Sequence, residues 1–353
     1  MNKFGKIKLG KRPYIIAEAG VNHSGNLNHA IKMIDAAAKS GANAIKFQSY
    51  KAERLASKFS PAYWDTKKEK TKTQFELFKK FDNFEISDYK KLSEHAKKKK
   101  IDFLSTPFDT DFVHSLNKLM PAFKIASADM NNFELLEAVS KYQKPVILSV
   151  GASKKNEIDE SINFLKKRKV KNIAILHCVL CYPTKNIDAN LSGISFLKEN
   201  YPNLVIGYSD HLLPSANNFP LLLSWILGAQ IIETHFTLDK KKVGNDHYHA
   251  LDPRDLKNFV KSFDEVCLLL GKKEKRILKC EISARKNARR SIVASEKIKK
   301  GDIFQKKNLS LKRPGTGIEP KFLEKVIGLK ANQNIHEDQI IKWKMVSKKV
   351  VKK

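Results

Sequence analysis

Residues 14–47 read YIIAEAGVNHSGNLNHAIKMIDAAAKSGANAIKF and contain one complete strand–helix–strand unit. Tyr14–Ala17 is a short apolar run, as expected of a strand buried on both faces. Asn28–Lys39 has apolar residues at helical spacing, and Gly41 is placed to end that helix. Ala44–Phe47 is a second apolar run. The stretch therefore predicts a parallel β-α-β unit.

The same alternation continues along the chain and gives eight apolar runs with helical stretches between them. A doubly wound sheet is the alternative architecture, but eight evenly used units favour closure into a (β/α)8 TIM barrel. The runs are Tyr14–Ala17, Ala44–Phe47, Ile101–Leu104, Ala122–Ala126, Pro145–Leu148, Asn172–Leu176, Leu204–Gly207 and Ala229–Ile232.

The pattern changes after Gly271. We expect a catalytic barrel over residues 1–271, a charged linker over 272–288, and a small β-rich domain over 289–353. Within the barrel, the longest connection lies between the second and third runs. A long loop at the carboxyl ends of barrel strands is more often functional than idle.

The composition argues against a membrane protein and against a secreted, disulfide-rich protein, and its high positive charge raises the question of nucleic-acid binding. The 353 residues have a formal net charge of +30, which is compatible with nucleic-acid binding. The lysines are scattered over nearly every predicted helix, however, so a solvated lysine-rich surface is the favoured interpretation, and no nucleic-acid partner is expected. No apolar run is long enough to cross a membrane, no signal segment follows the early lysines, and four cysteines form no disulfide framework. We expect a cytoplasmic protein.

Polar side chains follow all eight runs, at the rim where a barrel places its catalytic groups. Lys46 and Lys124 are embedded in apolar strands, where a lysine is costly unless it pairs with an anion. Thr106, Ser127 and Ser149 would supply hydrogen-bond donors beside them. The set fits a ligand with a phosphate and a carboxylate, although lysines that reach bulk water are the alternative.

Two histidines follow the last two strands at matching positions. His211 and His235 would both face one divalent ion if the strands are neighbours in a parallel sheet. Mn²⁺ suits such a site, and Mg²⁺ would be tolerated. The alternative is a pair of buried histidines with structural hydrogen bonds.

Glu18 follows the first strand, which in a closed barrel lies beside the eighth. A carboxylate next to a metal site is suited to general acid–base catalysis, and a structural salt bridge to Lys46 or Lys124 is the alternative. Cys178 and Cys181 lack the further ligands of a zinc site and are interpreted as ordinary thiols.

The residues at the strand ends resemble those of the sialic acid (N-acetylneuraminate) synthase family, which includes the legionaminic and pseudaminic acid synthases. The C-terminal stretch, from Arg289 to Gly317, resembles the antifreeze-like (SAF) domain of that family. The matching barrel segments are Ile16–Asn26 (IAEAGVNHSGN), Ile45–Gln48 (IKFQ), Ser105–Asp109 (STPFD), Lys124–Ser127 (KIAS), His177–Pro183 in part, Gly207–His211 (GYSDH) and Glu233–Thr237 (ETHFT).

The resemblance implies a reaction in which phosphoenolpyruvate attacks the aldehyde of an open-chain N-acylated amino sugar, with addition of water and loss of phosphate. It implies that His211 and His235 hold the metal and that Glu18 handles protons. Residues around phosphoenolpyruvate would be Lys46, Thr106, Lys124, Ser127 and Ser149, and Gln48 would also belong to the substrate-binding set. Tyr182, Ser209 and Asp246 would line the sugar, and Arg313 would reach its acyl group from the other subunit of a domain-swapped homodimer.

The chain departs from the family pattern at a few positions. Leu180 stands where the family usually has Asn, and Asp129 where it often has Glu. Both changes are expected on the sugar side, so N-acetylmannosamine is the first expectation for the acceptor and a diacetamido-trideoxyhexose the second. Rival classes are synthases of deoxy-octulosonate or heptulosonate phosphates, which lack the SAF domain, and non-catalytic nucleic-acid-binding or ice-binding proteins.

Overall fold

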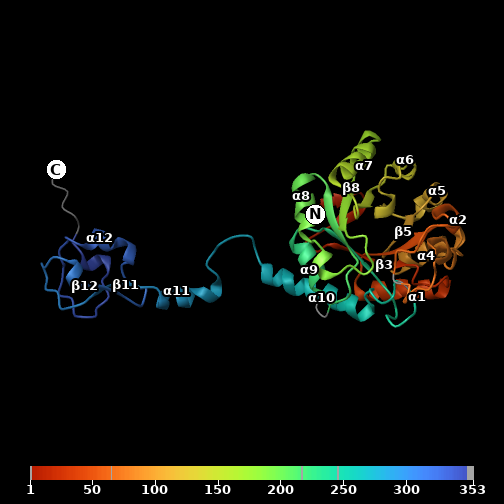
Figure 1. The fold of residues 1–353 in the computed structure, drawn as a ribbon. Helices are drawn as coiled ribbons and strands as arrows, with labels where there is room; N and C mark the ends of the chain where they lie inside the picture. The colour runs from red at the N-terminus through yellow and green to blue at the C-terminus, as the bar shows by residue number, and fades with distance from the viewer. Residues whose placement is uncertain (1, 65, 216–217, 245, 348–353) are drawn as a thin grey trace. The chain divides into compact units, whose positions relative to one another are not determined.

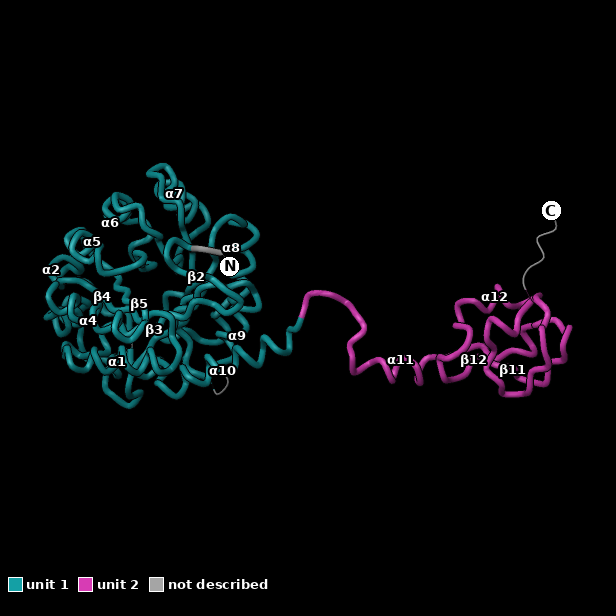
Figure 2. The backbone as a smooth tube through the Cα atoms, turned by 180° about the vertical axis from the view of Figure 1, so that it is seen from behind, with its two compact units in different colours: residues 1–271 teal, residues 272–353 magenta. Residues whose placement is uncertain are grey.

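The computed structural model describes residues 2–64, 66–215, 218–244 and 246–347. The chain divides into two compact units, residues 1–271 and residues 272–353, coloured separately in Figure 2. Each unit has a hydrophobic core of its own. Within the described residues, none of the helices is both long and apolar enough to cross a bilayer.

The first unit contains a nearly closed barrel of eight parallel strands, which confirms the predicted fold (Figure 1). The last strand pairs with the first, and the two strands at the ends of the hydrogen-bonded order, β5 and β6, are in contact. In chain order the strands are β3 (Tyr14–Gly20), β4 (Ala44–Ser49), β5 (Asp102–Pro107), β6 (Phe123–Ile125), β7 (Val146–Ser149), β8 (Ile173–Cys178), β9 (Val205–Asp210) and β10 (Ile231–His235).

A helix follows each strand and covers the outside of the barrel (Figure 1). These helices are α1 (Leu27–Ser40), α4 (Ile86–Lys98), α5 (Thr110–Leu116), α6 (Phe133–Ser140), α7 (Lys155–Lys167), α8 (Ser192–Asn200), α9 (Phe219–Ile226) and α10 (Pro253–Leu270). The long connection before α4 contains two more short helices, α2 (Ala52–Leu55) and α3 (Gln74–Lys79).

Local sequence signals fix the ends of α1 and α10. The Asn26 side chain accepts a hydrogen bond from the backbone of α1, and Gly41 ends the helix with a φ of 91°, a conformation that favours glycine. Asp252 accepts from two backbone amides of α10, and Pro253 occupies its first turn. These caps determine where the chain leaves the strand ends.

Strand register brings the first and last strands of the barrel together at the predicted site. His235 at the end of β10 pairs with Glu18 of β3, and Glu18 pairs with Lys46 of β4. Residues far apart in sequence are therefore neighbours across this seam.

A short antiparallel hairpin precedes the barrel and was not predicted from the sequence. It consists of β1 (Asn2–Phe4) and β2 (Ile7–Leu9), and Phe4 and Ile7 are buried in the barrel core. Its turn residue Gly5 (φ 61°) packs so closely on Pro145, just before β7, that a side chain there would clash. The hairpin therefore covers the amino ends of the barrel strands.

The second unit is built around an antiparallel pair, β11 (Ser291–Ala294) and β12 (Leu309–Lys312). Ile292, Phe304 and Ile335 are fully buried in its core. The segment expected to be a linker, residues 272–288, contains a 3₁₀ turn (Lys279–Glu281) and the helix α11 (Ile282–Ala288).

Candidate active site

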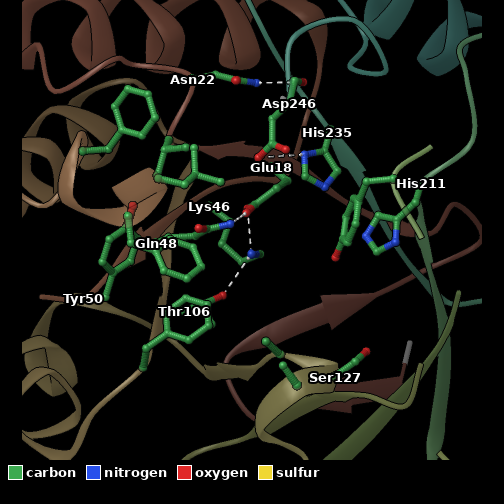
Figure 3. Close-up of a pocket in the computed structure, with 18 of the residues that line it drawn as sticks. Glu18, Asn22, Lys46, Gln48, Tyr50, Thr106, Ser127, His211, His235 and Asp246 are labelled. Atoms are coloured by element: carbon green, nitrogen blue, oxygen red, sulfur yellow. Dashed lines mark hydrogen bonds and ion pairs between the residues drawn. The ribbon is translucent and has the colours of Figure 1, made fainter. Parts of the chain in front are cut away.

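A cavity of about 430 Å³ lies at the carboxyl ends of the barrel strands (Figure 3). All the predicted site residues of the barrel line it: Glu18, Lys46, Gln48, Thr106, Lys124, Ser127, Ser149, Tyr182, Ser209, His211, His235 and Asp246. Arg313 belongs to the second unit and follows β12 directly, so its contact with a sugar stays a prediction.

Lys46 and Glu18 form a buried ion pair at the centre of the cavity. The Lys46 Nζ lies 2.6 Å from Oε2 of Glu18, and both side chains are 3% exposed. Lys46 also donates to Oγ1 of Thr106 at 3.0 Å, while Gln48 donates to Oε1 of Glu18 at 3.1 Å. The salt bridge left open as an alternative for Glu18 is thus present, and it is part of the cavity wall (Figure 3).

Glu233 is a buried carboxylate for which the sequence pattern predicted no role. Its Oε1 lies 3.6 Å from Nζ of Lys46 and 3.8 Å from Nζ of Lys124, and it accepts a hydrogen bond from Ser209 at 3.2 Å. Strand periodicity could have identified it, because Glu233 lies two residues before His235 and faces the same side of β10. Each lysine therefore has an anionic neighbour.

The wall around Lys124 presents hydrogen-bonding groups to the cavity. Lys124 donates to Oγ of Ser149 at 2.8 Å, and Ser127 accepts from the backbone N–H of Gly151 at 2.9 Å. Burial lowers the pKa of the Lys124 ammonium group, and the neighbouring Glu233 carboxylate opposes that shift. Ammonium and hydroxyl groups held in a buried wall are suited to binding an anionic ligand.

Glu18 is poised to exchange a proton near neutral pH. Burial raises the pKa of its carboxyl group to about 7, with Lys46 acting in the opposite direction and Glu233 adding to the rise. A catalytic acid or base works best when its pKa lies close to the operating pH. The carboxyl group therefore has the properties expected of the predicted acid–base residue.

His211 and His235 face the same part of the cavity, with ring centroids 5.4 Å apart. The Nδ1 of His211 lies 2.6 Å from the carbonyl oxygen of Val179 and therefore donates to it, so in the neutral imidazole the lone pair lies on Nε2. The Tyr182 ring packs on His211 at 4.2 Å. The two imidazoles are close enough to share one ion, as predicted from their strand positions.

Asp246 and His249 come from the loop after β10 and lie beside His235. Asp246 Oδ2 is 3.9 Å from Nδ1 of His235, and Asp246 Oδ1 is 4.0 Å from Nε2 of His249. Burial raises the pKa of Asp246 to about 6. The side chain of His249 is 0% exposed, so it is buried beside His235 and not solvated. Imidazole and carboxylate donors fit the predicted divalent ion.

The rest of the cavity wall is largely apolar and comes partly from the long connection after β4. Trp64 is held there by a hydrogen bond from its Nε1 to the carbonyl oxygen of Glu69, and the ammonium group of Lys68 lies 3.5 Å from the ring of Tyr248. The apolar lining residues are Leu55, Tyr63, Trp64, Leu77, Phe78, Phe81, Phe108, Leu180 and Val243. The long connection thus contributes to the site, as its length predicted.

Family models match both units of the chain. Residues 33–275 match the NeuB family, and residues 289–347 match the SAF domain. The first match covers most of the barrel, and the second covers the small unit around β11 and β12.

Individual relatives agree with these matches. The chain is 42% identical to a protein of Methanocaldococcus jannaschii, over 96% of this chain and 98% of the relative. It is 40% identical to the N,N'-diacetyllegionaminic acid synthase of Campylobacter jejuni, over 94% of this chain and 99% of the relative. The solved structure of the N-acetylneuraminic acid (sialic acid) synthetase of Leptospira borgpetersenii superposes with a TM-score of 0.70 at 36% identity, covering 80% of this chain and 94% of that one.

Proposed function

The chain belongs to the NeuB family, and from that premise we propose that it joins phosphoenolpyruvate to an N-acylated amino sugar to give a nine-carbon 2-keto acid. In this reaction C3 of phosphoenolpyruvate forms a bond to the aldehyde carbon of the open-chain sugar. Water adds at C2, and the C–O bond to phosphate breaks, so that inorganic phosphate leaves.

The observation that carries this proposal is the buried cluster of Lys46 and Lys124 at the barrel rim. Phosphoenolpyruvate has two anionic groups, a carboxylate and a phosphate, and each can accept charge-assisted hydrogen bonds from an ammonium group. Thr106 and Ser149, which are already bonded to these lysines, add hydroxyl groups to the same wall.

Glu18 acts as the acid–base group in this proposal. Its carboxylate takes a proton from the attacking water or returns one to the new sugar hydroxyl. His211 and His235 would hold a divalent ion, Mn²⁺ or Mg²⁺, and such an ion would supply Lewis-acid chemistry when bound. Tyr182 and Ser209 line the space left for the acceptor.

For the acceptor we propose a 2,4-diacetamido-2,4,6-trideoxyhexose over N-acetylmannosamine. Leu180 and the aromatic groups of Tyr63, Trp64 and Phe108 line the cavity. An apolar wall accommodates a methyl group and acetamido methyls, but leaves sugar hydroxyls without partners. The 40% identity to a legionaminic acid synthase supports the same choice.

Phosphate release with each sugar, followed by mass analysis of the product, tests both levels of the proposal. We expect release only when phosphoenolpyruvate, a divalent ion and an amino sugar are all present, with kcat/KM higher for the trideoxy sugar. A preference for N-acetylmannosamine would reverse the acceptor assignment alone. Undiminished release after rigorous chelation would remove the metal from the reaction, and no release with any amino sugar would refute the synthase activity.

A further inference from the structure

The loop after β10 places two more metal-binding side chains next to His235. One ligand atom from each of His235, Asp246 and His249 lies within 4.8 Å of the other two. The three side chains are 8%, 15% and 0% exposed, so the group lies inside the cavity wall and not on the surface. The positions of His235 and Asp246 are visible in Figure 3.

A second observation indicates that this group has a ligand. The buried Nδ1 of His235 has no hydrogen-bond partner within the described part of the chain. Buried polar atoms are nearly always bonded to protein, water or an ion, so such an atom calls for an explanation. The Oδ2 of Asp246 lies 3.9 Å from this nitrogen, which is too long for a hydrogen bond but suits two groups that share an ion.

We propose that His235, Asp246 and His249 form a three-donor site for a divalent transition-metal ion, in which His249 is a direct ligand. The His211 ring lies 5.4 Å from the His235 ring, measured between centroids, but His211 is not one of the three side chains whose ligand atoms lie within 4.8 Å of one another. The site thus combines His235 at the end of β10 with two side chains of the loop that follows it.

The donor types determine which ion the site prefers. Mg²⁺ takes oxygen ligands and keeps several waters, whereas two imidazoles with one carboxylate suit Mn²⁺ or Fe²⁺. The site is therefore expected to bind Mn²⁺ more tightly than Mg²⁺. A second imidazole from His249 strengthens that preference, because nitrogen donors favour the transition metals.

This inference rests on the proposed use of a divalent ion, but its test needs no substrate. Metal-free full-length protein is titrated with Mn²⁺, and the free ion is followed by its electron paramagnetic resonance signal. Loss of Mn²⁺ binding in a variant therefore bears on the ligand set, whereas the synthase activity is tested separately by phosphate release.

Substitution of His249→Gln is expected to raise the Kd for Mn²⁺ by roughly 10- to 100-fold while leaving the weaker Mg²⁺ binding nearly unchanged. The matched control is His247→Gln in the same loop, whose Nδ1 is bonded to Oγ1 of Thr237 at 2.8 Å and which lies outside the three-donor group. We expect the Kd of this control to stay within about twofold of the wild type.

Thermal unfolding of both variants separates loss of a ligand from loss of fold. If His249→Gln does not fold, His249→Asp replaces it; this variant keeps a donor but exchanges nitrogen for oxygen, so the ratio of Mn²⁺ to Mg²⁺ affinity should fall. An unchanged Kd in the folded His249→Gln protein, equal losses in His249→Gln and His247→Gln, or an unchanged affinity ratio in His249→Asp would each overturn the proposal.

Discussion

Burial and the neighbouring Lys46 ammonium group shift the pKa of the Glu18 carboxyl group in opposite directions. Burial is the larger effect and raises the pKa to about 7, even though Nζ of Lys46 is only 2.6 Å away. The carboxyl group of Glu18 therefore holds its proton to a higher pH than an exposed glutamate does, and its carboxylate form pairs with the Lys46 ammonium group.

We expect kcat/KM to rise with pH through a midpoint near 7, as Glu18 loses its proton and becomes able to act as a base. Glu18→Gln should abolish turnover and retain phosphoenolpyruvate binding, measured by calorimetry. The folded state keeps a proton that the unfolded state loses near the ordinary glutamate pKa of 4.5. The free energy of unfolding should therefore fall as the pH rises from about 4.5 to 7. A normal rate in Glu18→Gln would exclude the residue from catalysis.

Lys124 and Glu233 offer a test that separates ligand binding from stability. Lys124→Gln should raise the KM for phosphoenolpyruvate by roughly 10- to 100-fold, because a charge-assisted hydrogen bond is lost. It should also lower the thermal midpoint, since Glu233 loses one of its two buried ammonium neighbours. The double variant Lys124→Gln/Glu233→Gln should recover stability without recovering affinity. If the double variant recovered both stability and affinity for phosphoenolpyruvate, Lys124 would serve only to neutralise Glu233 and would not bind the ligand.

The two lysines of the site could be predicted from the sequence, whereas Glu233 and His249 could not, because only the lysines stand out against their neighbours in the chain. Lys46 and Lys124 were found because a lysine inside an apolar strand needs an anionic partner. Glu233 was not assigned because a carboxylate beside His235 is unremarkable in a sequence, and its two lysine neighbours come from other strands. His249 lies in a loop whose path depends on tertiary contacts, such as the hydrogen bonds from Asn22 to the carbonyl oxygens of Phe236 and Asp246.

Among the elements, α10 carries the clearest local signal. Asp252→Ala should lower the free energy of unfolding by about 1 kcal/mol, because two backbone N–H groups lose the side chain that caps them. Denaturant unfolding measures this change, and Asp252→Asn, which keeps an acceptor oxygen, is the control. Equal losses in both variants would assign the effect to the ion pair between Asp252 and Lys240 instead.

All eight barrel strands were predicted because each is a continuous apolar run buried on both faces. The hairpin of β1 and β2 was missed, since three-residue strands are too short to show a period. The helix α11 was also missed: its residues are exposed, so no apolar stripe marks it. A strand or helix that buries a regular face can be predicted from its apolar pattern. An element without such a face leaves no pattern in the sequence.

At the scale of the whole molecule, the two units have separate cores, so one can be changed without disrupting the other. We expect Arg313→Ala to raise the KM for the sugar by roughly tenfold or more while leaving phosphoenolpyruvate binding nearly unchanged, because one charge-assisted hydrogen bond to the acyl group would be lost. Steady-state kinetics with each substrate varied in turn provide the measurement.

Arg290→Ala in the same unit is the matched control, because Arg290 is an exposed arginine that carries no predicted role. Equal damage to the use of both substrates by Arg313→Ala would contradict its assignment to the sugar. Sedimentation of the full chain tests the accompanying prediction of a homodimer.

The seam between β3 and β10 has a consequence for how the enzyme is made. The Asn22 side chain and the Phe236 carbonyl that it bonds are 214 positions apart in the sequence. During translation, Glu18 and Lys46 therefore leave the ribosome long before His235 is added. Strand β3 can pair with β10 only after nearly the whole barrel has been translated. A product of interrupted translation that ends before β10 would contain the buried lysines but neither His235 nor the loop that follows it.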